Sequence, residues 1–410
     1  MGLELDANSA FIAIAISIFI GFVANFLFRK YGAPDVLILI LLGFLLGPGM
    51  LGLIDQSVEE IIVLITPFVG GIALAIVMFE AGMELNVKQV LGAFRPALLH
   101  SILAFVLSLV TTASLCILVM GWDLMVALTM GGIVASTSGA IVVPLVKRIH
   151  VSEKTRIVLT LEAAISEALS IAVTVILILL IRDGSMSAGM ALRIVGGTFL
   201  VSAVLGFGVG ILWLFALSRL SGQPFAYMIT LGMLLLIYAL ADVVAGGVGG
   251  GVIAALTFGL VLGNEFDVAR ALRMKNKPRR VDKRVKDFNS EISFFVRTFF
   301  FVYLGILSSL IDFTILTVML ALIIFAVLVA VRYITTLVEK ERMNLHKADS
   351  AAHLFLMPRG LVAAVLASLP LSFGVVSDEI GYTIIGTTVL VILLSTSLAS
   401  IGTYIIHSRF

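Results

Sequence analysis

Charged residues are scarce in this chain of 410 residues. Asp, Glu, Lys and Arg make up 13% of it, about half of the roughly 25% that is usual in soluble domains. Hydrophobic residues make up 60%, so too few polar residues remain to coat the two or three domains expected of a soluble chain of this length. The composition excludes a cytosolic enzyme or a nucleic-acid binder and indicates a polytopic membrane protein.

Several other features are missing. A single cysteine, Cys116, excludes a disulfide framework. The sequence has no phosphate-cradling motif, no metal-ligand spacing and no nucleophile–base pair, so we expect neither an enzyme nor a cofactor. The first eight residues carry Glu4 and Asp6 but no basic residue, which is not the start of a signal peptide. We therefore expect the first apolar run to be a retained membrane span.

Apolar runs long enough to cross a bilayer, ~20 residues each, occur repeatedly. They lie at residues 9–28, 34–54, 59–81, 94–120, 122–146, 155–181, 190–218, 225–246, 249–263, 291–311, 313–338, 350–373 and 381–406. The ninth run is short, and a re-entrant segment is the alternative there. The pattern predicts an all-α membrane protein with about 13 transmembrane helices.

The basic residues test this count. With thirteen spans, all but five of the 27 Lys and Arg residues fall on one side of the membrane. The exceptions are Arg182 and Arg193 on the other side and three arginines inside spans. Such an asymmetry marks the cytoplasmic side, so we expect the N-terminus outside and the C-terminus inside the cell, in the cell membrane.

The one sizeable loop covers residues 264–290 and is rich in Lys and Arg. We interpret it as a cytoplasmic connector that fixes the topology, with a binding site for anionic lipid as the alternative. The five histidines fall near span ends on the predicted inner side, at positions 100, 150, 346, 353 and 407. Interfacial histidines need no special role, and pH sensing is the alternative.

Charged residues inside spans are expensive and usually pair or serve function. The predicted spans contain Glu80, Glu162, Glu167, Asp242, Arg297, Arg332 and Arg359. Glu80 either reaches water near the end of its span or lines an ion path. Asp242 is expected at the interface, and Arg297 either reaches the interface or pairs. The remaining four can be sorted by depth.

Glu162 and Arg332 are predicted to lie at the same depth in the membrane. At ~1.5 Å rise per residue, both lie ~10 Å from the cytoplasmic face, whereas Glu167 lies ~18 Å deep, near the midplane. Five residues separate Glu162 from Glu167, or ~140° around a helix, so the two acids cannot face one partner. We expect a structural Glu162–Arg332 ion pair. Glu167 is then either an ion ligand or a protonated acid that bonds to a neighbouring helix.

Two spans carry helix-breaking sequences. One contains Ala135-Ser136-Thr137-Ser138-Gly139 and the other contains Met357-Pro358-Arg359-Gly360. Paired broken helices near the midplane free backbone groups that suit ion coordination, although small residues also serve close helix packing. We expect both helices to be interrupted and spans 4–6 and 11–13 to form two inverted repeats.

These residues together resemble the NhaP-type monovalent cation–proton antiporters, which include the sodium–proton exchangers. The resemblance covers nearly the whole chain. Its markers are Gly43-Phe44-Leu45-Leu46-Gly47-Pro48, Phe79-Glu80-Ala81-Gly82-Met83-Glu84-Leu85, Glu162-Ala163-Ala164-Ile165-Ser166-Glu167, Phe299-Phe300-Phe301-Val302-Tyr303-Leu304-Gly305, Arg332 and Pro358-Arg359-Gly360.

The resemblance implies a role for each matching residue. Glu162 takes the place of a glutamate that pairs with an arginine, here Arg332. Glu167 stands where the family has the aspartate that binds cation and proton alternately, and Ser166 stands where it has asparagine. Thr137 matches the family's threonine, whereas Ser138 replaces its aspartate. Glu80 resembles a glutamate near the ion path, and Arg359 is expected to support the broken helix.

The sequence therefore predicts an antiporter in which Na⁺, or alternatively K⁺ or Li⁺, competes with H⁺ for Glu167. Thr137, Ser166 and Ser138 would supply neutral oxygen ligands. If Glu162 stays tied to Arg332, one titrating carboxylate remains, which predicts electroneutral 1:1 exchange. An organic-anion carrier that uses Arg359 or Arg297, and a non-transporting sensor, are the alternatives.

The resemblance also implies a homodimer and an elevator movement. The expected core comprises residues 94–181 and 313–410, and the expected scaffold comprises residues 1–93 and 190–311. In this arrangement the ion site moves with the core across the membrane, while the scaffold forms the dimer.

Overall fold

The computed structural model describes most of the chain. The described residues are 19, 21–23, 35–47, 59–146, 148–183, 188–219, 226–244, 249–271, 283–309 and 313–409. Most of the first predicted span, residues 9–28, and the middle of the basic loop, residues 272–282, lie outside them. The anionic-lipid site, which is the alternative interpretation of this loop, therefore falls largely outside the described residues.

The described part of the chain is helical and contains no strand. Its helices are α2 (Asp35–Leu46), α3 (Glu59–Glu84), α4 (Val87–Met120), α5 (Leu124–Ala135), α6 (Gly139–Val146), α7 (Glu153–Asp183), α8 (Ala188–Arg219), α9 (Ala226–Val244), α10 (Gly250–Gly263), α11 (Glu265–Ala271), α12 (Lys283–Ser309), α13 (Ile315–Met343), α14 (Lys347–Phe355), α15 (Leu361–Ser372) and α16 (Asp378–Arg409). The all-α prediction is confirmed.

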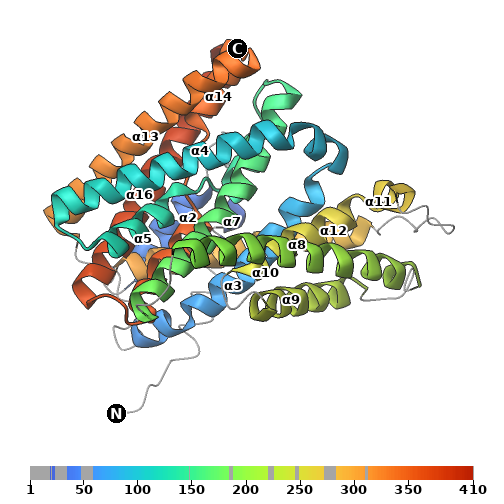
Figure 1. Ribbon diagram of the computed structural model, residues 1–410, viewed down its shortest axis with the longest axis horizontal. Helices are drawn as coiled ribbons and strands as arrows, with labels where there is room; N and C mark the ends of the chain where they lie inside the picture. The colour runs from blue at the N-terminus through green and yellow to red at the C-terminus, as the bar shows by residue number, and fades with distance from the viewer. Residues whose placement is uncertain are drawn as a thin grey trace.

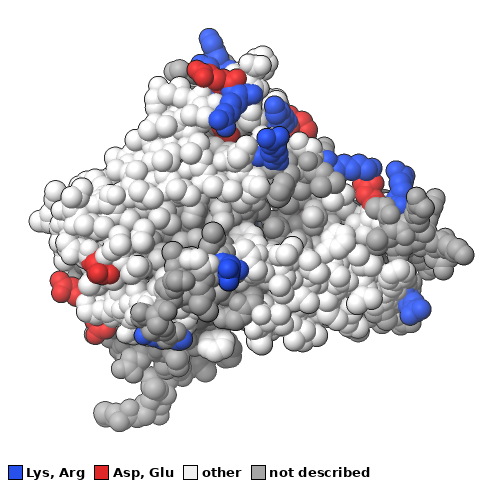
Figure 2. Space-filling view, viewed as in Figure 1, with Lys and Arg blue, Asp and Glu red and all other residues white. Residues whose placement is uncertain are grey.

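Seven segments within the described residues are long and apolar enough to cross a membrane, and three shorter helices are also apolar. The predicted spans match helices closely, as for the run 155–181 and α7. Counting thirteen complete crossings would also require the residues that are not described, so the number stays a prediction. Much of the face in Figure 2 carries no charged atoms, and Lys and Arg gather mainly along its upper edge. An uncharged belt of this kind suits a lipid environment.

Local signals set several helix ends. The Asp123 carboxylate caps α5 by accepting a hydrogen bond from the Met125 N–H at 2.9 Å, which satisfies a free donor of the first turn. The Thr314 hydroxyl caps α13 in the same way, 3.1 Å from the Thr317 nitrogen. Asn344 ends α13 with φ 51°, a left-handed conformation that asparagine tolerates.

The helices pack in two groups that meet through α15. In the upper left of Figure 1, α4 packs on α5, α7 and α13, while α16 packs on α13, α14 and α15. Toward the lower right of Figure 1, α10 packs on α8 and α9. α10 also packs on α3, and α12 packs on α2 and α3. α15 contacts both α16 and α3. Helices far apart in the sequence therefore build one bundle.

Two of the glycine motifs meet where α2 packs on α12. A Cβ atom on Gly43 would come within 2.9 Å of the Gly305 Cα atom, closer than real Cβ contacts allow. Glycine at both positions lets the two backbones touch, as small residues do in membrane helix pairs. This contact explains why both motifs carry glycine.

Candidate functional site

The first helix break separates α5 from α6 in the middle of one apolar span. α5 ends at Ala135, and Ser136 adopts an extended conformation with φ −78° and ψ 152°. α6 then begins at Gly139. Residues 136–138, called the first break below, therefore leave backbone N–H and C=O groups of two helix ends without helical partners.

The second helix break covers residues 356–360, between α14 and α15. The two breaks are in direct contact, because the Ser138 N–H donates a hydrogen bond of 2.7 Å to the Pro358 carbonyl. Both interruptions were predicted from the sequence. Their contact joins backbone from two segments more than two hundred residues apart, and it creates a junction of four helix ends inside the bundle.

Gly360 allows this close contact between the breaks. A Cβ atom at this position would lie 2.7 Å from the Ser138 Cβ atom. We therefore expect Gly360→Ala to push the breaks apart and lower the melting temperature of the purified protein. The combined variant Gly360→Ala/Ser138→Gly should recover much of the loss, because it removes the opposing side chain. Gly208→Ala is the matched control, since a Cβ atom there meets nothing within 4 Å. An unchanged melting temperature for Gly360→Ala would contradict the packing argument.

Glu167 of α7 is directed at the junction. Its side chain is buried, and its Oε1 atom accepts a hydrogen bond of 3.1 Å from the Gly139 N–H, the first residue of α6. The Ser138 hydroxyl lies beside the same carboxylate. The start of a helix carries a partial positive charge that favours an anion. Among the described residues no Lys or Arg forms an ion pair with Glu167, so its recorded partners are neutral.

Two of the predicted neutral ligands line the same junction. The Thr137 N–H donates to the Ser166 hydroxyl at 3.0 Å, and Ser166 donates to the Ala163 carbonyl at 3.2 Å. The Thr137 hydroxyl donates to Glu162 Oε1 at 3.2 Å. The structure thus brings Thr137, Ser138, Ser166 and Glu167 together around the first break, and Thr137 links this group to Glu162.

Glu162 meets Arg332, as the depth argument predicts. Arg332 Nη1 contacts Glu162 Oε1, and Arg332 Nη2 donates to Glu162 Oε2 at 2.8 Å. Both side chains are buried. The guanidinium also donates through Nε to the His353 carbonyl at 2.5 Å and through Nη2 to the Leu356 carbonyl at 3.4 Å. This pair therefore ties α7 and α13 to the end of α14, next to the second break.

Arg359 bridges the two breaks from within. Its buried guanidinium donates through Nε to the Val134 carbonyl at 2.8 Å and through Nη1 to the Met357 carbonyl at 2.6 Å. Carbonyl groups at a helix end carry partial negative charge, which a cation stabilises. The side chain predicted to support a broken helix thus contacts the end of α5, through Val134, and the backbone of its own break, through Met357.

Glu80 and Asp242 contact other helices than those of the junction, whereas Arg297 touches its edge. Glu80 of α3 is partly buried and faces Ser293 and Arg297 on α12. Arg297 also donates to the Ala140 carbonyl of α6 at 3.4 Å, so it reaches toward the junction from the α12 side. The Asp242 carboxylate accepts a hydrogen bond of 3.0 Å from Gly249 and thereby caps the start of α10.

Two histidines form part of the site's surroundings, contrary to the sequence-based expectation. The expectation of interfacial positions is wrong for His100 and His353, which are both buried. His100 Nε2 lies 3.3 Å from Glu162 Oε2 and 2.9 Å from Arg332 Nη1. Both side chains contact Glu339 of α13 from other helices, so their burial depends on which helices pack together. Hydropathy alone carries no signal for this.

Comparisons with known proteins agree with the resemblance seen in the sequence. The family described as "Sodium/hydrogen exchanger, transmembrane" matches residues 14–403. A K⁺/H⁺ antiporter NhaP2 of Shewanella baltica is 28% identical over 95% of this chain and 66% of the relative. A K⁺/H⁺ antiporter NhaP of Alkalimonas amylolytica is 24% identical over 63% of this chain and 44% of the relative. The aligned part of this chain spans less than half of the length of several such relatives.

The fold also matches a solved structure. The sodium proton antiporter MjNhaP1 of Methanocaldococcus jannaschii superposes with a TM-score of 0.80 at 20% identity, covering 98% of this chain and 99% of that protein. At this identity the likeness establishes the fold. Together with the family match over most of the sequence, it confirms the resemblance and the multi-pass membrane architecture: the chain belongs to the sodium/hydrogen exchanger family of transmembrane proteins.

Proposed function

We propose that this protein exchanges a monovalent cation for H⁺ across a membrane, and that the two ions compete for the Glu167 carboxylate. The observation that carries the proposal is the isolation of this acid: it is buried at the junction of two broken helices and contacts the Gly139 N–H. Burial penalises an unpaired carboxylate anion, so a proton or a metal cation stabilises it. Binding one of the two excludes the other, which is the condition for exchange.

The ligands of the cation follow from the same contacts. Thr137 and Ser138 belong to the first break, and Ser166 of α7 contacts it. These residues offer hydroxyl or carbonyl oxygen atoms. Oxygen ligands suit hard cations such as Na⁺ and K⁺, and half-helix ends in membrane transporters supply them. We therefore assign cation binding to Glu167 together with these three residues of the junction.

The Glu162–Arg332 pair supports a 1:1 stoichiometry. Its opposite charges neutralise each other in a buried setting, which leaves Glu167 as the carboxylate that titrates during transport. We expect exchange to be electroneutral. In proteoliposomes without an imposed K⁺ gradient, Na⁺- or Li⁺-driven proton flux should be the same at positive, zero and negative membrane potential, set by a gradient of a lipophilic ion that is not a candidate substrate. A flux that changes systematically with potential would contradict the 1:1 assignment.

The identity of the transported cation has to be measured directly. Relatives and neighbours are named for different ions: K⁺ for the NhaP proteins, sodium for MjNhaP1 and ammonium for an antiporter subunit of Alkalihalophilus pseudofirmus that is 32% identical over 29% of this chain. Compared with the aspartates of the family, glutamate at position 167 extends the carboxylate further, and serine at position 138 removes a negative charge. We keep Na⁺ as the first candidate, and proton flux against Na⁺, K⁺, Li⁺ and NH₄⁺ decides among them.

Alternating access would move the ion site across the membrane with its helices. We propose that residues 94–181 and 313–410 form the moving core and that residues 1–93 and 190–311 form the scaffold of a homodimer. The packing of α4 on α7 and α13, and of α10 on α3 and α8, supports this division. The N-terminus would face the outside and the C-terminus the cytoplasm of the cell.

An organic-anion carrier is disfavoured by the contacts of Arg359. Its guanidinium donates to the Val134 and Met357 carbonyls, so an anionic substrate would have to displace two backbone partners. A non-transporting sensor would bind cation without moving protons. Proton flux on addition of a monovalent cation to proteoliposomes separates these functions, and the complete absence of flux for all four cations would refute the proposal.

A further inference from the structure

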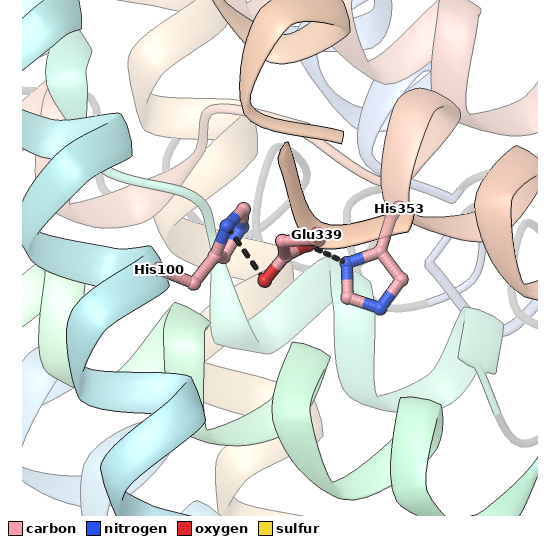
Figure 3. A group of neighbouring side chains, drawn as sticks. All are labelled: His100, Glu339 and His353. Carbon is pink, nitrogen blue, oxygen red and sulfur yellow. Dashed lines mark ion pairs between the residues drawn. The ribbon is translucent and has the colours of Figure 1, made fainter. Parts of the chain in front are cut away.

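Three buried side chains outside the proposed ion site converge from different helices. His100 comes from α4, Glu339 from α13 and His353 from α14, and Figure 3 shows the carboxylate between the two imidazole rings. His100 Nδ1 lies 2.9 Å from Glu339 Oε1, and His353 Nδ1 lies 2.7 Å from Glu339 Oε2. One potential ligand atom from each residue falls within 4.8 Å of the other two.

These short distances are not aligned hydrogen bonds. His100 Nδ1, His353 Nδ1, His353 Nε2 and Glu339 Oε2 are buried and have no aligned hydrogen-bond partner among the described residues. The two Nδ1 atoms still form ion pairs with the carboxylate, whereas His353 Nε2 has neither an ion pair nor a hydrogen bond among the described residues. A buried polar atom without a partner costs about 1–3 kcal/mol, so a cation that all three side chains bind would stabilise the cluster. Such a ligand must bind two imidazole rings and one carboxylate.

The donor set points to a divalent transition metal. Two histidines and one glutamate form a donor set that binds zinc in proteins and leaves a fourth position open. Imidazole nitrogen favours zinc and its first-row neighbours, whereas Mg²⁺ and Ca²⁺ prefer oxygen ligands. Tetrahedral ligands at 2.0–2.1 Å from a metal are about 3.3 Å apart. The two short histidine–glutamate contacts would have to open by less than about 1 Å, and ligand atoms that now lie up to 4.8 Å apart would have to move closer together.

The carboxylate of Glu162 beside His100 suits a metal-binding histidine. Its Nε2 atom lies 3.3 Å from Glu162 Oε2, the arrangement in which a carboxylate orients a metal-binding histidine through the other ring nitrogen. Arg332 Nη1, 2.9 Å from Nε2, also contacts Glu162 Oε1. A guanidinium only donates, so the Arg332 contact forms when Nε2 is the acceptor and the ring proton lies on Nδ1. If Nδ1 binds a metal instead, the proton moves to Nε2 and points at Glu162, and Arg332 Nη1 then donates to Glu162 Oε1 alone.

We propose that His100, Glu339 and His353 form a binding site for a divalent transition metal of the zinc class, separate from the site of the transported cation. A bound metal would join α4 and α13 to α14, three residues before the second break begins at Leu356. It would thereby stabilise the bundle beside the junction. This inference does not depend on the proposed exchange activity.

Co²⁺ is the first probe, because tetrahedral Co²⁺ absorbs visible light far more strongly than the hexahydrated ion. The full chain, purified in detergent and stripped with a chelator, is titrated with Co²⁺ near pH 7.5. We expect one Co²⁺ per chain with a tetrahedral spectrum, displacement by one equivalent of Zn²⁺, and a higher melting temperature with Zn²⁺ than without.

Glu339→Gln and His353→Gln keep the size and polarity of the side chains but remove a ligand. Each should weaken Co²⁺ binding at least as much as the loss of a group that only orients a ligand, on the order of 10–100-fold, and abolish the stabilisation by Zn²⁺. His407→Gln is the matched control, because His407 is exposed and stacks on His150 with ring centroids 5.9 Å apart.

Three results would overturn the site. They are the absence of metal binding by the unmodified chain, unchanged binding by both ligand variants, and loss of binding in His407→Gln. Melting temperatures of the metal-free variants show whether each one is folded. If His353→Gln does not fold, the Glu339→Gln variant alone decides the result.

Discussion

Glu167→Gln is expected to abolish cation-dependent proton flux at every pH while the protein still folds. Glutamine keeps the shape of the side chain, and its carbonyl oxygen can still accept the Gly139 N–H, which lies 3.1 Å from Oε1 in the structure. An amide cannot take up a proton or carry the negative charge that a cation neutralises. The measurement is proton flux in liposomes that hold the purified variant, with Na⁺, Li⁺ and K⁺ between about pH 6 and 9, a range that covers the titration of a buried carboxylate.

Two further variants test whether the loss of flux comes from the missing carboxylate of Glu167. Glu167→Asp retains a carboxylate but retracts it by about one C–C bond, ~1.5 Å, away from the Gly139 nitrogen. We expect exchange to persist with a changed apparent affinity or cation preference. Glu379→Gln is the control for removing a carboxylate, since Glu379 lies exposed in the first turn of α16. Robust exchange by Glu167→Gln would refute the assignment and direct attention to Glu162 and Glu80.

Among the variants proposed here, Arg332→Ala is expected to lower the free energy of unfolding the most. It leaves the buried Glu162 carboxylate without its guanidinium, and removing one partner of a buried ion pair costs about 3–5 kcal/mol. The His353 and Leu356 carbonyls beside the second break also lose their donor. Thermal unfolding of the purified protein in one detergent measures the effect. Arg342→Ala, on an exposed position near the end of α13, is the matched control and should melt as the unmodified protein does.

A double-mutant cycle separates the ion pair from the backbone contacts. Glu162→Gln and Arg332→Leu should each destabilise the protein, and the combined variant should lose less than the sum of the two. It should not recover fully, because leucine donates no hydrogen bond to the two carbonyls. Strictly additive losses would contradict a direct interaction, since residues in contact couple by about 0.5–3 kcal/mol. Glu162→Gln should retain some exchange, which distinguishes its role from that of Glu167.

The sequence alone determined the class of the protein and predicted the relative depth of its charged residues. Scarce charge and repeated apolar runs predicted a helical membrane protein, and the helical rise predicted that Glu162 and Arg332 share a level while Glu167 lies deeper. Ser, Thr, Gly and Pro within apolar runs predicted both breaks. These features are local, because hydropathy, helix rise and helix interruption depend on neighbouring residues.

Tertiary structure decided which side chains meet at each depth. Only packing shows that the Ser138 N–H reaches the Pro358 carbonyl, that Arg359 reaches Val134, and that His100, Glu339 and His353 cluster inside the bundle. Helix rise fixes height in the membrane, but the neighbour of a side chain depends on helix rotation and on which helices pack together. His100 and His353 were misjudged for this reason: span boundaries follow the bilayer, whereas burial follows the protein that surrounds each residue.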